Sequence, residues 1–267
     1  NGTGDTTTFT GSVTAAAPSQ VNLAGTIQTT NTAISLGDAG TPIVLTANTI
    51  LSGNTAGAIT LGGTVNGAYS LTVNTTGDNT FSRAVGNTTA LTTLTTNASG
   101  TTYINGGAIT TSSTQTYNDA VVLGADTTLT TTDSNITLGS TVDGDGTARD
   151  LTIDMDNSGV GADGTVQFVN TVGVNNSLNA ISITGNLNLD AAISNTTSLS
   201  VSGTSNLGAN VTTTGDQTYS GAAVLSANVI LTTTSNGSVY FGGTIDGGYD
   251  LDITAHGTGD TTFAQAV

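Results

Sequence analysis

The sequence predicts an all-β fold, a parallel β-solenoid of about thirteen coils with ~20 residues in each. Three observations support this prediction. The composition favours strands and turns over helices. Several sequence blocks recur three times in the same order, and short segments alternate apolar with polar residues.

The composition disfavours both helices and disorder. Charged residues make up 7% of the 267-residue chain, against about 25% in an ordinary protein. Every acid is Asp and both bases are Arg, so the exposed helix formers Glu and Lys are absent. Thr and Val suit strands, whereas Asn, Asp and Gly suit turns. The hydrophobic fraction of 36% does not fit the low-hydrophobicity, high-charge composition of a disordered chain.

Repeated blocks follow one another in a fixed order. The first is an apolar stretch that ends in Leu, the second reads Leu-Gly-Gly-Thr-Val-Asn-Gly in its first copy, and a short strand follows it. The copies of the apolar stretch are Ile43–Leu51, Val121–Leu129 and Ala223–Leu231. Those of the second block are Leu61–Gly67, Leu138–Gly144 and Phe241–Gly247. Those of the short strand are Tyr69–Val73, Arg149–Ile153 and Tyr249–Ile253. A Gly-Asp-x-Thr-Phe block ends at Phe81 and Phe263, with relatives that end at Phe9 and Phe168.

The spacing of the blocks indicates the coil length. The interval from Leu123 to Leu225 exceeds the interval from Leu45 to Leu123 by ~24 residues, which is close to one additional coil. Two sets of apolar residues are spaced by 20, Leu45, Val65 and Val85, and Leu51, Leu71 and Leu91, which indicates an underlying period of roughly twenty residues for a three-sided coil.

Short alternating segments supply the strands. They are separated by clusters of Gly, Asn or Asp, and they follow one another too closely for long hairpin strands joined by two-residue turns. The corners of a coil fit this pattern better than a sandwich or a barrel does. The clearest examples are Ile59–Leu61, Leu71–Val73, Ile181–Ile183, Leu187–Leu189 and Leu199–Val201.

The repeats predict one continuous solenoid over residues 1–267. Its long-repeat copies lie roughly at 1–81, 82–168 and 169–267. The opening segment Asn1–Phe9 matches His256–Phe263, and the final residues match Ser82–Val85, after which the earlier copy continues. Because no cap is visible at either end, we expect the segment to be an excerpt of a longer array.

The charge restricts the partners. A net charge of −16 with only Arg83 and Arg149 as bases argues against nucleic acid and against anionic membrane surfaces. No apolar run approaches 18 residues, so no membrane span is expected. The chain has no cysteine and therefore no disulfide.

The sequence offers few groups for catalysis. His256 is the only histidine, and its counterpart in the opening copy is Asn1, which indicates a surface turn. Arg83 is replaced by Gln265 in the matching copy, and Arg149 by Tyr249. No Gly-x-Ser-x-Gly elbow is present. We therefore predict that the chain is not an enzyme; a polysaccharide-acting β-helix enzyme with paired Asp residues is the less favoured alternative.

One stretch carries oxygen ligands of the kind that calcium prefers. The candidate ligands are Asp143, Asp145, Asp150, Asp154 and Asp156. The stretch lacks the full acid pattern of an EF-hand, and Asp-Gly is also ordinary turn chemistry. The turn interpretation is favoured, so no cofactor is expected, and Ca²⁺ is the alternative.

Threonine triplets raise one further alternative, an ice-binding face. They occur at residues 6–8, 130–132, 212–214 and 232–234. They do not recur at a strict coil period in the sequence, so a solvated strand face is the favoured interpretation.

The segment Leu61–Gly67, followed by Leu71-Thr-Val73, resembles the repeats of filamentous-haemagglutinin-type exoproteins. These are bacterial adhesins exported by two-partner secretion, and autotransporter passengers have similar repeats. The resemblance is one of style and covers nearly the whole chain. It implies a right-handed parallel β-helix, a location outside the cell or on the bacterial cell surface, and a role in adhesion, matrix or biofilm.

These observations together predict a structural or adhesive stalk segment. The expected partners are other repeats of the same protein, which would associate end to end and assemble homotypic filaments. Glycans, or the surface of a host or neighbouring cell, are further expected partners. A calcium- or glycan-binding solenoid module is the alternative function.

Overall fold

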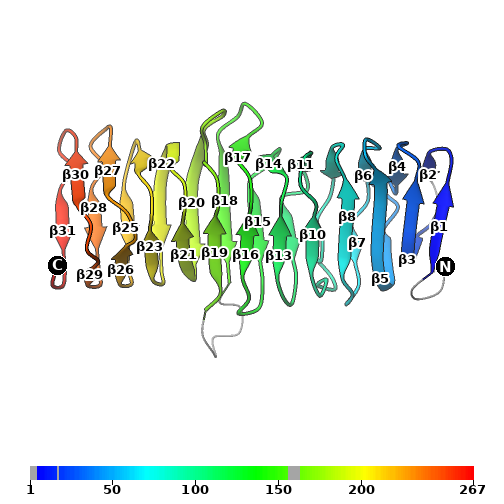
Figure 1. Cartoon of the computed structure of the whole chain (residues 1–267), viewed down its shortest axis with the longest axis horizontal. Helices are drawn as coiled ribbons and strands as arrows, with labels where there is room; N and C mark the ends of the chain where they lie inside the picture. The colour runs from blue at the N-terminus through cyan, green and yellow to red at the C-terminus, as the bar shows by residue number, and fades with distance from the viewer. Residues whose placement is uncertain (1–4, 17, 156–162) are drawn as a thin grey trace. The chain divides into compact units, whose positions relative to one another are not determined.

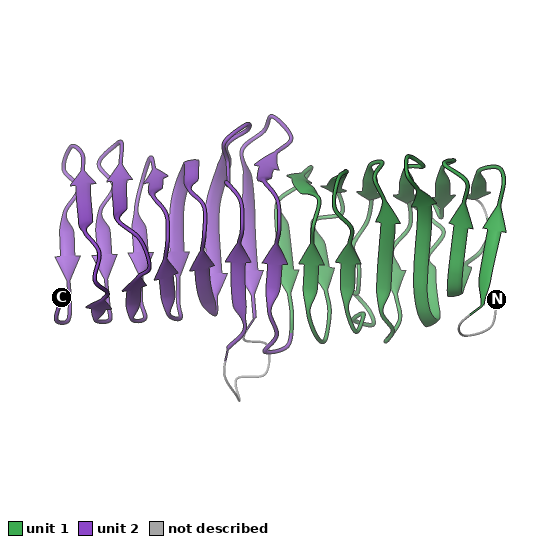
Figure 2. Ribbon diagram, viewed as in Figure 1, with its two compact units in different colours: residues 1–131 green, residues 132–267 purple. Residues whose placement is uncertain are grey.

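The computed structural model describes residues 5–16, 18–155 and 163–267, and its regular structure is entirely β (Figure 1). Within the described residues there is no helix. The strands pair in parallel from one coil to the next, which confirms the β-solenoid and is consistent with a right-handed β-helix. The chain forms two compact units, residues 1–131 and 132–267 (Figure 2).

Unit 1 contains strands β1 to β15. One sheet runs in the order β1-β3-β5-β8-β10-β13, with β7 also paired to β5. A second runs β14-β11-β9-β6-β4-β2, and β12 pairs with β15. The bounds are β1 Thr6–Phe9, β2 Val13–Ala15, β3 Val21–Thr29, β4 Ile34–Leu36, β5 Ile43–Asn54, β6 Ile59–Leu61, β7 Val65–Asn66, β8 Leu71–Thr75, β9 Asn79–Phe81, β10 Leu94–Thr96, β11 Thr101–Ile104, β12 Ala108–Thr110, β13 Gln115–Tyr117, β14 Ala120–Leu123 and β15 Thr127–Thr130.

Unit 2 contains strands β16 to β31. Its sheets run β16-β19-β21-β23-β26-β29 and β18-β20-β22-β24-β27-β30, and β22, β25, β28 and β31 pair in series. The bounds are β16 Ile136–Leu138, β17 Val142–Gly144, β18 Arg149–Asp154, β19 Thr165–Phe168, β20 Leu178–Thr184, β21 Asn186–Leu189, β22 Ile193–Val201, β23 Ser205–Leu207, β24 Val211–Thr213, β25 Gln217–Tyr219, β26 Ala223–Leu225, β27 Val229–Thr233, β28 Val239–Phe241, β29 Ile245–Asp246, β30 Leu251–Ala255 and β31 Thr261–Phe263.

The number of coils is close to the predicted number, but the coils vary in length. Each unit contributes six strands in series to one sheet, so the chain has about 12 coils, against about thirteen in the prediction. The coil that leads from Leu187 to its partner Ser205 is short, whereas the coil that leads from Ile136 to its partner Val166 is much longer.

In the first set of apolar residues spaced by 20, the structure pairs one step directly and not the other. Val65 pairs with Val85, but on its other side Val65 pairs with Ile43 and not with Leu45. A shift of two residues leaves the same side chains facing inward, so apolar alternation by itself does not distinguish these registers.

In the second set neither step is a direct pair. Leu71 pairs with Thr49, not Leu51, and with Leu94, not Leu91. The first difference is again a shift of two residues along an alternating strand. The second arises because Leu91 lies before β10, where it forms an isolated bridge to the next coil.

The repeated blocks have the same internal register in both units. Ile43 pairs with Val65 in unit 1, and the corresponding Ala223 pairs with Ile245 in unit 2. The aromatic blocks agree as well, because Leu61 pairs with Phe81 and Phe241 with Phe263. The first and third copies are therefore structural equivalents and not only similar sequences.

The core of each unit is a column of inward-facing apolar side chains. Most strands of three residues, such as β6 and β28, bury their first and third side chains and leave the middle one partly or fully exposed. In unit 2 the rings of Tyr219, Phe241 and Phe263 stack in series, with centroid separations of 4.9 and 5.7 Å. Such stacking stabilises the core beyond what the burial of each ring contributes by itself.

Candidate functional site

Asp143, the first calcium candidate, connects two coils of unit 2. Its side chain is 4% exposed in β17. Oδ1 accepts hydrogen bonds from the backbone amides of Asn175 at 2.9 Å and Asn176 at 3.2 Å, and Oδ2 accepts one from Nδ2 of Asn175 at 2.8 Å. The carboxylate thus serves as an acceptor for the backbone of the following coil.

Unit 1 has the same device with an amide in place of the carboxylate. Asn66 occupies the equivalent position of its block, and its Oδ1 accepts from the backbone amides of Thr88 at 3.0 Å and Thr89 at 3.2 Å. A neutral carbonyl oxygen therefore accepts in unit 1 the bonds that Asp143 accepts in unit 2. We call this arrangement, Asn66 or Asp143 with the two amides it receives, the inter-coil acceptor.

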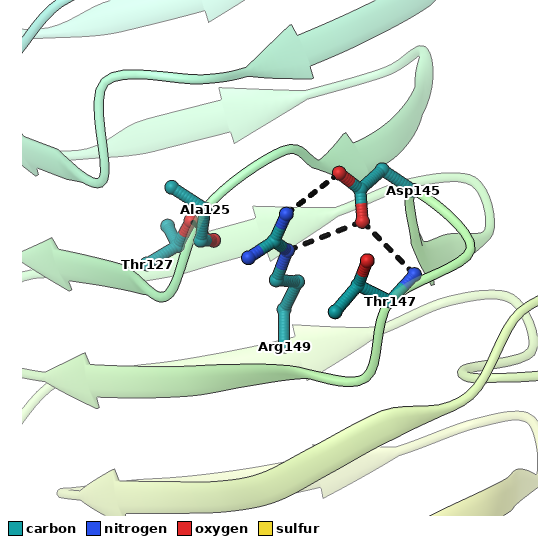
Figure 3. A network of polar contacts seen from close by, with 5 residues as sticks. All are labelled: Ala125, Thr127, Asp145, Thr147 and Arg149. Carbon is teal, nitrogen blue, oxygen red and sulfur yellow. Dashed lines mark hydrogen bonds and ion pairs between the residues drawn. The ribbon is translucent and has the colours of Figure 1, made fainter.

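The second candidate, Asp145, forms an ion pair at the surface (Figure 3). The Arg149 guanidinium donates to both carboxylate oxygens, with Nη2 at 2.8 Å and Nε at 3.1 Å. The backbone amide of Thr147 donates to Oδ1 at 3.1 Å. These hydrogen bonds, that from Arg149 first, lower the pKa of Asp145 to about 2.

The remaining candidates do not join a common site in the described structure. Asp150 accepts hydrogen bonds from Nδ2 of Asn179 at 2.7 Å and the amide of Ala180 at 3.0 Å. Asp154 ends β18, and Asp156 lies outside the described residues. No group of three or more His, Cys, Asp or Glu side chains that could hold a metal occurs among the residues that the structure describes. Calcium binding stays a prediction.

The two other residues singled out for chemistry lie on the surface. His256 follows β30 at an exposed turn, where the sequence placed it. Its Nδ1 lies 2.7 Å from the carbonyl oxygen of Thr233, one coil away. Arg83 is exposed at a bend after β9.

Sequence reasoning missed a buried polar cluster that occurs in both units. In unit 1, Nε2 of Gln115 donates to the carbonyls of Ile109 at 3.2 Å and Thr130 at 2.9 Å, and its Oε1 accepts from the Tyr117 hydroxyl at 2.8 Å. Both side chains are fully buried, and burial raises the pKa of the Tyr117 hydroxyl. The cluster therefore satisfies the polar atoms that it takes out of water.

Unit 2 repeats the same cluster. Nε2 of Gln217 donates to the carbonyls of Val211 at 3.3 Å and Thr232 at 3.0 Å, and the Tyr219 hydroxyl donates to Oε1 at 3.2 Å. The sequence signal was present: Gln-Thr-Tyr occurs at 115–117 and 217–219, with Thr four residues before each Gln.

Asp119 was also missed, and it is a deeply buried acid of unit 1, at 1% exposure. Oδ2 accepts from Nδ2 of Asn79 at 2.8 Å and from the Thr102 hydroxyl at 3.1 Å, and Oδ1 accepts from the amide of Gly100 at 2.9 Å. Burial raises the pKa of Asp119, while the hydrogen bonds act to lower it. The carboxyl group holds three coil segments together.

Two cavities are open grooves on the outer faces. The one in unit 1 has a volume of about 550 Å³, and we call it the Tyr69 groove. Its walls include Gly25, Asn48, Ile50, Tyr69, Ser70 and Thr72. The one in unit 2 has a volume of about 510 Å³ and includes Asn188 and Asn206, whose side chains are hydrogen-bonded to each other at 2.7 Å.

Neither a family model, nor a curated protein, nor a solved structure matches the chain. The resemblance to filamentous-haemagglutinin-type repeats therefore stays a prediction.

The threonine triplets are more regular than the sequence indicated. Thr212 pairs with Thr232, and Thr232 with Thr254, so two of the triplets do recur one coil apart. In β24, however, only the middle residue, Thr212, is directed outward, and Thr213 is buried. The strand therefore contributes one threonine to a single row.

The described part of the chain contains no helix long and apolar enough to cross a membrane.

Proposed function

We propose that this chain is a structural and adhesive stalk segment of a large secreted bacterial surface or matrix protein, with rigid extension as its main task. The observation that carries the proposal is the bonding of each coil to the next by side chains as well as backbone. Asn66 and Asp143 each receive two backbone amides from the following coil. Hydrogen bonds along the stacking direction oppose bending and unwinding of a coil.

The positions of the acidic groups support this function over catalysis. Asp143 and Asp150 accept backbone and side-chain amides from the next coil, and Asp145 pairs with Arg149. The lining of the Tyr69 groove contains no charged residue. Catalysis by paired carboxylates needs two of them to face a bound substrate, so these contacts favour a structural role.

Scattering in solution tests the extension. A compact domain of this length has a radius of gyration of about 18 Å. The radius of gyration of a stalk segment is expected to be clearly larger than that value. It is also expected to stay constant when the protein is warmed to just below its melting temperature. A radius equal to that of a compact protein of 26.2 kDa would contradict the proposal.

The location is tested separately on the cells that make the protein. Antibodies raised against the chain are expected to label intact cells. Labelling that requires permeabilised cells would contradict a surface or matrix location.

A further inference from the structure

The Tyr69 groove exists because the corner between two parts of β5 is longer than the matching corner of β3. Leu23 pairs with Leu45, but Gly25 pairs with Thr49, so β5 holds two additional residues between the paired positions. Gly25 has a φ of 68° and no side chain, which leaves the neighbouring coil exposed at this point. The volume of about 550 Å³ is in the range of small-molecule sites.

Two apolar side chains stand exposed in this groove. Ile50 and Tyr69 are each 40% exposed, although most large apolar side chains of the unit are buried in its core. A tyrosine ring offers an apolar face together with a hydroxyl that remains hydrated. The pair therefore forms a small apolar platform that is open to solvent.

Polar groups surround the platform and have capacity for a ligand. Oδ1 of Asn48 accepts the backbone amide of Ser70 at 3.0 Å, which fixes the orientation of the Asn48 amide. Within the part of the chain that the structure describes, Nδ2 of Asn48 and the hydroxyls of Ser70 and Thr72 form no hydrogen bond. One amide donor and two hydroxyls thus lie beside the exposed ring.

We propose that the Tyr69 groove binds a neutral oligosaccharide. Sugar rings have an apolar face that packs on an aromatic ring, and hydroxyls that pair with amides and hydroxyls. A purely apolar ligand would leave Asn48 and Ser70 unpaired on burial. A cation would lack a carboxylate ligand among the lining residues, and the net charge of −16 repels acidic sugars.

Unit 2 keeps part of this arrangement. Ile230 and Tyr249, the equivalents of Ile50 and Tyr69, are 44% and 52% exposed. Oδ1 of Asn228 accepts the amide of Asp250 at 3.1 Å, as Asn48 accepts that of Ser70. The middle copy instead has Arg149 at the tyrosine position. Tyr69→Arg therefore reproduces in unit 1 the residue of the middle copy and removes the exposed ring.

This inference rests on the proposed function, because it supplies the ligand for adhesion, but the two can fail separately. The test is calorimetry on the whole chain with neutral tri- and tetrasaccharides of glucose, mannose and galactose, and with uronic acid oligomers of the same length. At least one neutral sugar is expected to bind. Tyr69→Ala and Tyr69→Arg are expected to weaken that binding about tenfold, the loss of one ring-stacking contact.

Tyr240→Ala is the matched control, since Tyr240 is 39% exposed in β28 of unit 2 and lies outside the groove. It is expected to leave the affinity unchanged, and Tyr69→Phe, which keeps the ring, is expected to weaken it much less than Tyr69→Ala. Circular dichroism on each variant checks folding. Absence of binding by any neutral sugar, preference for the uronic acid oligomers, or equal losses in Tyr69→Ala and Tyr240→Ala would each overturn the inference. If scattering still reports an extended particle in that case, the stalk function stands without the groove.

Discussion

Buried glutamine side chains connect neighbouring strands at matching positions of both units. Gln115 and Gln217 each use Nε2 on two carbonyls and Oε1 on a tyrosine hydroxyl. In each unit Nε2 also donates to a threonine hydroxyl, and a leucine of similar size would remove all of these contacts. The buried carbonyls and the hydroxyl would then lose partners that water does not replace.

We expect Gln115→Leu to lower the free energy of unfolding by about 2 kcal/mol or more, because it leaves the Tyr117 hydroxyl buried and unpaired. Urea unfolding followed by circular dichroism measures the change. The double variant Gln115→Leu with Tyr117→Phe is expected to recover part of the loss, since both partners of one hydrogen bond are then absent. If adding Tyr117→Phe to Gln115→Leu lowered the free energy of unfolding further instead of restoring part of it, the lost hydrogen bond would not be the cause of the destabilisation.

Asp119 makes the stability of the chain depend on pH, and the direction of this dependence follows from the direction in which its pKa is shifted. Because the folded-state pKa is raised above the ordinary value of 3.8, the folded state holds the proton more tightly than the unfolded state. The contribution of Asp119 to stability is therefore fully present below that value and is lost as the pH rises through the folded-state pKa. Asp119→Asn removes this titration.

We expect wild type to lose more stability than Asp119→Asn between about pH 4 and pH 7, as measured by urea unfolding at each pH. Asp78→Asn, a change at an exposed acid of the same unit, serves as the control and is expected to follow wild type. Equal pH dependence of all three proteins would show that Asp119 does not titrate with folding.

Among the elements, the strands themselves were predictable and their registers were not. Ile59–Leu61 and Leu71–Val73 were expected as strands and form β6 and the first part of β8. Their inward and outward residues are read directly from the alternation of apolar and polar residues. The register depends on corner lengths, which can change by an even number of residues without changing that alternation.

For the candidate site, the sequence predicted a residue with a polar role but not the partners of that residue, as the inter-coil acceptor shows. The sequence singled out Asp143 as an oxygen ligand, and its oxygens do accept hydrogen bonds, but from the backbone of the following coil. The comparison with Asn66 at the same block position points to this role, because an amide replaces the carboxylate there. The sequence does not show that Asp143 lies close in space to residues 175–176, because these residues lie a full coil further along the chain.

We expect Asp143→Ala to destabilise unit 2 by about 2 kcal/mol, since the amides of Asn175 and Asn176 lose their acceptor. Asp143→Asn keeps an oxygen in place, as Asn66 does in unit 1, and is expected to cost less than about half of that. Thermal unfolding of the three proteins makes the comparison. Equal destabilisation by Ala and Asn would mean that the charge, rather than the acceptor oxygen, is what the site needs.

For the molecule as a whole, the dominant electrostatic feature is an excess of acid. The chain has eighteen Asp residues and two Arg residues, which gives the net charge of −16. Like charges spread over one folded chain repel one another, and dissolved salt screens that repulsion. We therefore expect sodium chloride to raise the melting temperature of the whole chain.

Calcium chloride at the same ionic strength separates screening from a specific site. A ligand present at a hundred times its dissociation constant stabilises a protein by about 2.7 kcal/mol, and each kcal/mol raises the melting temperature of a protein of this size by roughly 2–4 °C. We expect no such additional rise, because Asp143, Asp145 and Asp150 already accept hydrogen bonds from the protein. A calcium-specific rise that persists at matched ionic strength and disappears in Asp150→Asn would instead establish the calcium site and assign Asp150 to it.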